Sequence, residues 1–527
     1  MSINSFSFLI FLAASVLLYY IVPKRGQWIV LLLASGYFYL SYSPRAAVYL
    51  GVTILLTYAA ARRLSSMNAA QKGALAEVER PQKAAVKKQW VGKKRKVLGA
   101  VLIVNFLTLA VFKYFDSWFH TWNLILSAMH IGFQFKPLEL LLPLGISFYI
   151  FQTSGYLLDV YKGKVEAEKN IFKYALFAAY FPQMIQGPIN RYPELAGQLT
   201  AQRRFRAENI RDGILLMIWG MLKKTFIADV LAPGVTEIYN NYGSYSGAVV
   251  FLGATMYCLQ LYCDFSGGID IVRGASTLFG VEMAHNFKRP YFAVSIDEFW
   301  RRWHISLGEW MKDYLFYPLA LSKWMTKLGK HSRSVFGDRV GKLTSPCVST
   351  VIVFLAVGVW QGPGLSNVAY GLWNGFLMSG AMLCAPYFRS LNERLHLDPK
   401  GRTLHVIRVL RTCFLLIIGR YFSRAASLMG ALGMMKQTVT QFTWNLNGQS
   451  LFSFGLGGRD YLVVLAASCV LFFVSWQQEK GVEIRKTLAQ KPWYVQFPPV
   501  FVSLLLLIVF VYLNGDYTAI SYVYENV

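Results

Sequence analysis

Charged and aromatic residues that could support chemistry are crowded into one stretch of the chain, residues 262–319. Its centre reads EFWRRWHISL over residues 298–307, and the segment HNFKRPY precedes it at residues 285–291. Long apolar runs flank this stretch on both sides. Because polar groups held close to lipid are energetically expensive, they commonly mark a substrate path or a reaction site. The stretch is therefore the first candidate for the functional centre.

A second interpretation of the same residues is purely structural. Trp303, Leu307 and Trp310 recur at the spacing of one helix face, which is typical of an amphipathic helix lying on a membrane surface. In that interpretation His304 is an ordinary interfacial residue. Periodicity alone favours the surface helix, so a functional role for His304 needs support from other features of the sequence.

The composition of the chain predicts that its elements lie in a bilayer. Hydrophobic residues make up 55% of the 527 residues and charged residues only 15%, whereas a soluble chain carries about a quarter charged residues. A water-soluble core cannot absorb so much apolar sequence without leaving large exposed patches, but lipid can accept it. Soluble globular classes are excluded, and we expect an all-α polytopic membrane protein.

Basic residues assign the two sides of the membrane. Residues 62–97 carry eleven Lys and Arg against two Glu, so the positive-inside rule places this loop in the cytoplasm. Apolar segments recur from Phe6–Val22 to Pro498–Leu513. About eleven crossings put every basic block on one side, if residues 171–184 re-enter and residues 348–387 form a hairpin. Both termini then lie outside the cytoplasm, and orientation together with anionic lipid headgroups accounts for the net charge of +26 without a nucleic-acid partner.

Two further features of the sequence limit the possibilities. The six cysteines lie in or beside apolar runs, with no spacing typical of a metal site, so we interpret them as small buried hydrophobic residues and expect no bound metal. Met1–Asn4 lack the basic residues of a signal peptide, and we interpret Phe6–Pro23 as a retained first span.

The functional stretch resembles the signature of the membrane-bound O-acyltransferase family. The resemblance rests on DEFWRRWHISL at residues 297–307, with DYL at 313–315. Other blocks agree in family order: LPLGISFY at 142–149, DVY at 159–161, FPQ at 181–183, GPI at 187–189 with Arg191-Tyr192, and DFSG at 264–267. The bacterial alginate O-acetyltransferase and teichoic-acid D-alanyltransferase branches are the most similar. Together the blocks are far more specific than any one of them.

The resemblance implies a transmembrane helical ring around a central tunnel, with re-entrant and interfacial helices. It divides the chain into N-terminal spans (residues 1–136), an acyltransferase core with a cytoplasmic funnel (137–386), and C-terminal spans with an extracytoplasmic tail (387–527). A cytoplasmic thioester such as acetyl-coenzyme A would enter from one side. An acceptor, or an extracytoplasmic partner transferase, would approach from the other. No permanently bound cofactor is implied.

The resemblance also places two histidines in the funnel, and one of them is missing here. His304 occupies the first position, while the Trp-His-Gly motif of the second reads Trp360-Gln361-Gly362. Attack by a hydroxyl on an acyl group needs a base to take the proton, and a glutamine amide cannot shuttle a proton. Three interpretations stay open: an engineered inactive variant, a divergent enzyme with His304 as its sole base, or a chain that has kept only a binding role.

Other residues in the matching blocks are candidates with structural alternatives. Asp264 either caps a helix or faces the tunnel, and Glu298 is spaced to pair with Arg301 or Arg302. Arg191 either holds the phosphates of the donor or contacts lipid headgroups. The remaining tunnel candidates are Trp303, Ser306, Trp360 and Asn374, and the Asn374 amide suits either orienting a neighbour or bonding to the backbone.

The C-terminal segment contains ISYVY at residues 520–524. It loosely resembles the aromatic tail of some bacterial family members or their partner subunits, whose central tyrosine enters the tunnel. A phenol can carry an acyl group when a base activates it, so Tyr522 is a candidate acyl carrier. The alternative is an interfacial cluster of aromatic residues on the outer face.

The leading hypothesis is an O-acyltransferase subunit of the bacterial cytoplasmic membrane. It would move an acetyl group across the membrane for O-acetylation of an extracytoplasmic polysaccharide, and the patch at residues 420–427 favours the alginate-like branch. The second hypothesis is transfer of D-alanine from a carrier protein to teichoic acid. The third, from another class, is a transporter without covalent chemistry. It predicts internal repeats with paired broken helices, and the sequence shows no such repeats.

Overall fold

The computed structural model describes residues 3, 5–137, 142–398, 401–443, 452, 454–513 and 522. Throughout this described part every regular element is a helix, which confirms the all-α prediction. Seven of the described helices are long and apolar enough to cross a membrane. A helix satisfies its backbone hydrogen bonds internally, as the bilayer core requires. The expected total of eleven crossings, the re-entrant segment and the enclosed tunnel stay predictions.

The chain forms two compact units. The first is built from the residues up to Met217 together with Ile271–Ala284, and the second from Ile218–Asp270 and the described residues from His285 onward. Two helices, α9 (Ala207–Lys223) and α11 (Gly247–Leu278), pass from one unit into the other. The three-region division expected from the resemblance stays a prediction.

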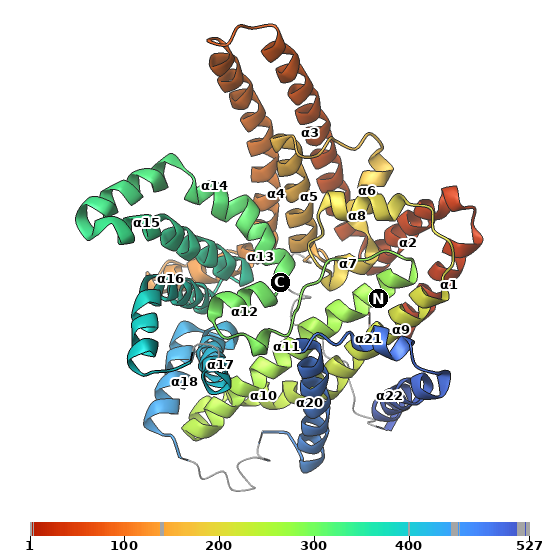
Figure 1. Cartoon of the computed structure of the whole chain (residues 1–527), viewed down its shortest axis with the longest axis vertical. Coiled ribbons are helices and arrows are strands. Elements are labelled where there is room, and N and C mark those ends of the chain that lie inside the picture. The colour runs from red at the N-terminus through yellow and green to blue at the C-terminus, as the bar shows by residue number, and fades with distance from the viewer. Residues whose placement is uncertain are drawn as a thin grey trace. The chain divides into compact units, whose positions relative to one another are not determined.

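The first unit contains the N-terminal helices (Figure 1). They are α1 (Phe6–Ile21), η1 (Lys24–Gly26), α2 (Gln27–Tyr42), α3 (Pro44–Ala76), α4 (Lys83–Ala128), α5 (Ile146–Lys162), α6 (Ile171–Ala179), α7 (Phe181–Gln186) and α8 (Tyr192–Thr200). Ser43 begins α3 by accepting a hydrogen bond from the backbone N–H of Ala46 at 3.2 Å, and Pro44 occupies the first helical position. Both features are typical of a helix start.

The basic segment 62–97, expected as a cytoplasmic loop, is helical except at residues 77–82, and its cytoplasmic position stays a prediction. Helices α3 and α4 continue through it and run side by side past α5 in Figure 1, and only a short turn around Pro81 separates them. Alanine, lysine, arginine, glutamine and glutamate are all strong helix formers. The buried ammonium of Lys94 holds the two helices together by donating to Asn68 at 2.9 Å and to Gln71 at 2.7 Å.

The second unit contains the functional stretch and the C-terminal helices. They are η2 (Lys224–Asp229), α10 (Val230–Asn240), η3 (Tyr242–Ser244), η4 (Pro290–Phe292), α12 (Ile296–Arg302), α13 (Ile305–Met311), η5 (Lys312–Phe316), α14 (Tyr317–Ala320), α15 (Lys323–Gln361), α16 (Leu365–Arg394), α17 (Arg402–Arg424), α18 (Leu428–Thr440), α20 (Gly458–Glu479), α21 (Ile484–Ala489) and α22 (Trp493–Leu513).

Helices α15 and α16 form the expected hairpin over residues 348–387. Small residues let the two backbones approach closely. A Cβ added to Gly371 would overlap the carbonyl oxygen of Phe354, and one added to Gly375 would lie 3.0 Å from the Cα of Val351. This close approach is typical of glycine at helix contacts in membranes. The hairpin fixes the end of α15, where Trp360 and Gln361 lie.

Candidate active site

The functional stretch is not one surface helix. Helix α12 ends at Arg302 and α13 begins at Ile305, while Trp303, Leu307 and Trp310 are only 2%, 3% and 6% exposed. Between the two helices His304 adopts a left-handed conformation, with φ 47° and ψ 52°. Residues other than glycine rarely adopt it, and such strain concentrates at functional sites. The amphipathic surface helix predicted from periodicity is therefore wrong.

Backbone pairing with a distant segment explains the break. The N–H of Ile305 donates to the carbonyl of Asn286 at 3.0 Å, and the N–H of Lys288 donates to the carbonyl of Arg302 at 2.9 Å. Phe287 and Trp303 form an isolated antiparallel bridge between these bonds. A continuous helix would use the same backbone groups within itself. The pairing with residues 286–288 thus takes the place of helical hydrogen bonds at residues 302–305, and it holds the backbone directly before and after His304.

Asn286 sets the tautomer of His304. Its Oδ1 atom accepts from the backbone N–H of Ser306 at 2.9 Å and from the Ser306 hydroxyl at 2.8 Å, which identifies this atom as the amide oxygen. The Nδ1 atom of His304 lies 3.4 Å from the same oxygen. Because an oxygen can only accept, Nδ1 carries the hydrogen and the basic lone pair lies on Nε2.

Aromatic rings enclose the imidazole. Phe265 on α11 meets it edge to face, with the ring centroids 4.8 Å apart, and Trp360 on α15 lies at 6.4 Å. Trp360 is 6% exposed and is followed directly by the half-buried Gln361 at the last position of α15. The structure therefore brings His304 and the Trp360-Gln361 pair into one region, as the resemblance implies.

Burial determines the protonation state of His304. The imidazole is fully enclosed, and this desolvation lowers its pKa from 6.5 to about 3. The side chain is therefore neutral near pH 7, and its Nε2 atom can accept a proton from an attacking hydroxyl. A base of low pKa is weak. Protonation of His304 would therefore require a nearby group that stabilises the imidazolium.

The same burial predicts a loss of stability in acid. The unfolded chain binds a proton at His304 below pH 6.5, whereas the folded protein does not until the pH approaches 3. The contribution of neutral His304 to the free energy of unfolding is fully present above pH 6.5. It decreases as the pH falls, and the loss reaches about 1.4 kcal/mol at roughly pH 5.5. Thermal unfolding in detergent at roughly pH 7.5 and 5.5 should show a smaller acid-induced loss in His304→Gln than in the wild type. His331→Gln changes an exposed imidazole and should keep the wild-type loss, and equal losses in all three proteins would contradict the assignment.

Asp264 belongs to a buried ion cluster, so helix capping is the wrong interpretation. It lies inside α11, and the Lys224 ammonium is 2.6 Å from its Oδ1 atom and 2.8 Å from a carboxylate oxygen of Asp229. These three side chains are 1–4% exposed. Lys224 and Asp229 are the two ends of η2, a π-helical turn of a kind common at functional sites.

A second lysine, Lys223 at the end of α9, pairs with α11. The ammonium of Lys223 lies 2.7 Å from Asp270 and 2.9 Å from the hydroxyl of Ser266. The two backbones approach closely here, because a Cβ added to Gly267 would lie 2.8 Å from the carbonyl oxygen of Gly220. The absence of a side chain at Gly267 therefore lets the two consecutive lysines, Lys223 and Lys224, reach the acidic residues of α11.

Tyr522 lies against this ion cluster. It is 1% exposed, and the Lys224 ammonium sits 4.5 Å from the centre of its ring. A cation held over an aromatic face is stabilised most when both groups are desolvated. The buried position differs from an interfacial aromatic residue on the outer face. Tyr524 lies outside the described residues.

Trp303 is held by a buried arginine that the site prediction left out. Arg420 on α17 is 2% exposed, and its guanidinium lies 5.5 Å from the Trp303 ring and 5.7 Å from the Tyr370 ring. It also donates to the Tyr370 hydroxyl at 3.3 Å. Buried cations are expensive unless they are compensated, and here aromatic faces supply the compensation.

Asn374 performs both roles considered for it. Its Oδ1 atom accepts from the indole N–H of Trp300 at 3.2 Å, and its Nδ2 atom donates to the carbonyl of Tyr370 at 2.9 Å. It therefore orients α12 against α16.

Arg191 belongs to the first unit, where it immediately precedes α8 and is half-buried.

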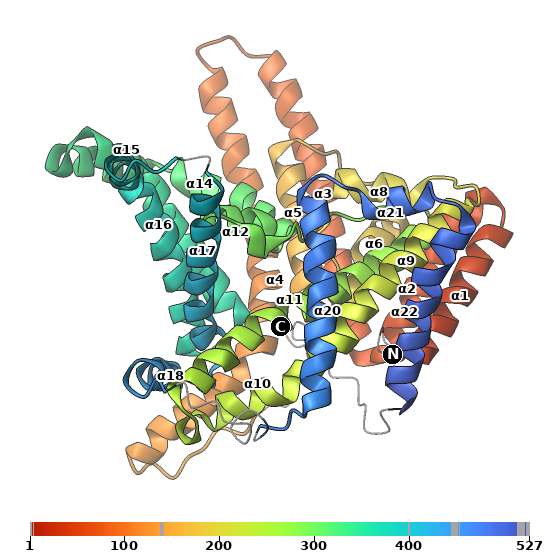
Figure 2. The ribbon, with the colours of Figure 1, turned by 60° about the horizontal axis from the view of Figure 1, so that its bottom comes forward.

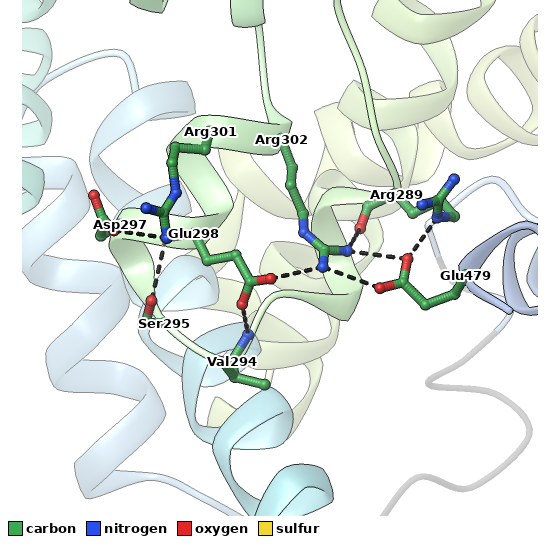
Figure 3. A network of polar contacts seen from close by, with 8 residues as sticks. All are labelled: Arg289, Val294, Ser295, Asp297, Glu298, Arg301, Arg302 and Glu479. Carbon is green, nitrogen blue, oxygen red and sulfur yellow. Dashed lines mark hydrogen bonds and ion pairs between the residues drawn. The ribbon is translucent and has the colours of Figure 1, made fainter. Parts of the chain in front are cut away.

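An ion network supports α12 from its exposed side (Figure 3). The expected Glu298–Arg302 pair is confirmed at 2.6 Å, and Arg302 also reaches Glu479 on α20 at 3.0 Å. Arg301 pairs with Asp297 at 2.9 Å instead of with Glu298. The acids occupy the first turn and the arginines the last, which matches the helix dipole. The network fixes the helix that ends directly before Trp303 and His304.

Sequence reasoning missed Asn286, Lys224 and Arg420 as site residues. Lys223-Lys224 stands inside an apolar run, and Arg420 follows another. Ionisable residues in such runs are functional candidates by default, so this signal was present. Asn286 gave no comparable signal, because its role depends on Ser306 and His304, which are distant in sequence.

The fold and the site together define a class of protein: a multi-pass helical membrane protein with a buried, neutral histidine enclosed by aromatic rings. The membrane-bound O-acyltransferase family model matches residues 165–423. A probable alginate O-acetylase of Pseudomonas syringae pathovar tomato is 30% identical over 473 residues, which cover 90% of this chain and 81% of that protein. The chain therefore belongs to the membrane-bound O-acyltransferase family.

Two other relatives are named for different activities. A peptidoglycan O-acetyltransferase of Helicobacter pylori is 29% identical over 82% of this chain and 76% of its own length. A teichoic acid D-alanyltransferase of Bacillus subtilis is 26% identical over 54% of this chain and 69% of its own length. The alginate and peptidoglycan relatives are both named for transfer of an acetyl group to oxygen. The third relative is named for a different acyl group, D-alanine, and the three names give three different acceptors.

Proposed function

We propose that this chain moves an acetyl group from a cytoplasmic thioester, acetyl-coenzyme A, across the bacterial cytoplasmic membrane for O-acetylation of an extracytoplasmic polysaccharide. The observation that carries the proposal is His304, whose Nε2 lone pair is set by the Asn286 amide inside an aromatic enclosure. Relatives named as alginate and peptidoglycan O-acetylating proteins support acetyl as the group transferred. Both termini lie outside the cytoplasm in this proposal.

The chemical step needs one base and one leaving group. A hydroxyl oxygen attacks the thioester carbonyl, Nε2 of His304 takes the hydroxyl proton, and the carbon–sulfur bond breaks to release the coenzyme A thiolate. Gln361 could hydrogen-bond to the carbonyl oxygen but could not take the proton. His304 is then the sole base of this chain. Arg191 would contact lipid headgroups or the phosphates of the donor, and no resident cofactor takes part.

Tyr522 is the proposed first acceptor of the acetyl group. Its buried ring over Lys224 supports this role, because an ester on a buried side chain is protected from water. The acetyl ester would then pass from the phenol oxygen to a hydroxyl of an extracytoplasmic partner transferase. Asp264 and Lys224 would position the phenol in this scheme.

Labelling of the purified full chain with radioactive acetyl-coenzyme A tests the proposal. We expect an ester-linked label on the protein that hydroxylamine removes, that maps to Tyr522 and that is lost in Tyr522→Phe. Tyr494→Phe changes an exposed ring on α22 and serves as the matched control. An equal label in Tyr522→Phe would refute the carrier role. If neither the wild type nor Gln361→His consumes the acetyl donor, acetyl transfer itself is refuted, and consumption of a D-alanyl carrier protein would favour teichoic acid as the acceptor.

A further inference from the structure

A cleft of about 820 Å³ lies beside α16 and α17, away from the ion cluster and the imidazole. Figure 2 shows the two helices side by side within the second unit. Ser295 and Ile296, at the start of α12, also line the cleft. It is thus a hollow between two adjacent helices that reaches the helix leading to His304.

The walls of the cleft combine two kinds of chemistry. One part is apolar and includes Phe376 and Phe388, whose side chains are 62% and 50% exposed. The other part is basic and includes Arg389, Arg408 and Arg411, with Glu393 as the acidic lining residue. A ligand that matches both parts has a long apolar portion and an anionic group.

The arginines favour an anion because Arg408 and Arg411, three residues apart on α17, are neighbours on one face of the helix. Arg408 lies close enough to Arg411 for the two positive charges to repel. A phosphate between them would remove this repulsion, and a guanidinium can bind two phosphate oxygens at once. Three arginines against one glutamate leave the lining with a surplus of positive charge.

We propose that this cleft binds an anionic phospholipid, with its phosphate against Arg408 and Arg411 and an acyl chain along the apolar wall. Basic pockets between transmembrane helices on the cytoplasmic side are suited to anionic headgroups. The basic residues 389–411 carry the charge pattern expected of that side. Exposed phenylalanines beside the arginines provide the apolar contact that a free phosphate would not use.

The bound lipid would also support α12, the helix that precedes His304. Arg411 donates to the carbonyl of Val294 at 2.9 Å, and the N–H of Val294 donates to Glu298 at 2.9 Å. Glu298 pairs in turn with Arg302 at 2.6 Å, at the end of α12 (Figure 3). An anion that fixes Arg411 therefore fixes the start of the helix that ends beside Trp303.

Cys384 provides a direct measure of occupancy. It lines the cleft and is exposed, whereas the exposed Cys469 lies on α20 outside it. The full chain would be placed in neutral micelles that contain either phosphatidylglycerol or phosphatidylcholine. Peptide mass spectrometry would then measure how fast maleimide alkylates each cysteine. We expect phosphatidylglycerol to slow alkylation of Cys384 but not of Cys469. At about 1 kcal/mol per arginine, the variant Arg408→Gln/Arg411→Gln should need about 30-fold more phosphatidylglycerol for half protection.

A matched charge loss elsewhere distinguishes the site from general surface attraction. Arg485→Gln/Lys491→Gln removes two exposed cations, one within α21 and one just after it, both outside the cleft, and should leave protection unchanged. Equal protection by both lipids, or an equal shift in both double variants, would overturn the proposal. Equal protection by inorganic phosphate or by acetyl-coenzyme A would overturn it in favour of those ligands. Alkylation does not require acyl transfer, so its result is independent of the proposed function.

Discussion

Replacing His304 with glutamine is expected to lower the rate of acetyl transfer by about 10²–10⁴-fold, the usual effect of losing a general base. Glutamine can keep the hydrogen bond to the Asn286 oxygen because its amide nitrogen donates, but it cannot accept and release a proton. The loss should therefore appear in kcat while the protein stays folded. Release of coenzyme A from acetyl-coenzyme A, with the purified full chain in lipid nanodiscs, measures it.

The control for this substitution is His331→Gln, which makes the same chemical change at an exposed position of α15. It should leave the rate unchanged. Comparable rates in His304→Gln and the wild type, with a measurable wild-type rate, would refute His304 as the base. An equal fall in both variants would point to a general disturbance of the fold.

Gln361→His in the same assay separates the three interpretations of that position. A large gain in rate would show that the chain lacks a base that the site is built to use. An active wild type without gain would leave His304 as the sole base. If both proteins are inactive while acetyl-coenzyme A still binds, a binding role remains. Trp360 directly precedes this position, and the centre of its ring lies 6.4 Å from that of the His304 imidazole. A change at residue 361 can therefore affect the surroundings of His304.

Much of the fold could be predicted from hydropathy because lipid restricts the choices. A spanning segment must satisfy its own backbone, so long apolar runs become helices. The hairpin of α15 and α16 was expected from the charge pattern, because it keeps the basic blocks on one side of the membrane, and the structure adds the close approach of the two backbones at Gly371 and Gly375. The charge of residues 62–97 predicted a side of the membrane and not a secondary structure, whereas their composition favours the helices that the structure shows.

The site was predicted in part, because short motifs identify residues but not their partners. His304 and Trp360 were selected from motifs, and the structure brings them together. Helical periodicity failed at residues 303–304 because the backbone there pairs with residues 286–288, and no local pattern records such a pairing. The two alternatives for Asp264, a helix cap or a tunnel residue, stayed open for the same reason, since its partner Lys224 lies 40 residues away.

Substituting Lys224 with methionine is expected to destabilise the protein by about 3–5 kcal/mol, because it leaves two buried carboxylates without their cation. Lys224, Asp229 and Asp264 are at most 4% exposed, so water cannot take over this role. Methionine keeps the apolar length of the side chain and removes only the charge. The contact with the Tyr522 ring is lost as well. The shift in the unfolding midpoint of the purified protein, in detergent with increasing denaturant, measures the cost.

Two companion variants give this prediction a sharp test. Lys223→Met removes the neighbouring cation, but its partner Asp270 is 17% exposed, so water can compensate and the loss should be clearly smaller. The triple variant Lys224→Met/Asp229→Asn/Asp264→Asn removes the whole charge cluster and should recover most of the lost stability, because a neutral buried group costs far less than an unpaired charge. If the triple variant is less stable than Lys224→Met alone, the unpaired carboxylates are not the cause of the destabilisation. If the triple variant is stable but no longer accepts an acetyl label at Tyr522, the cluster contributes to the position of the tyrosine as well as to the fold.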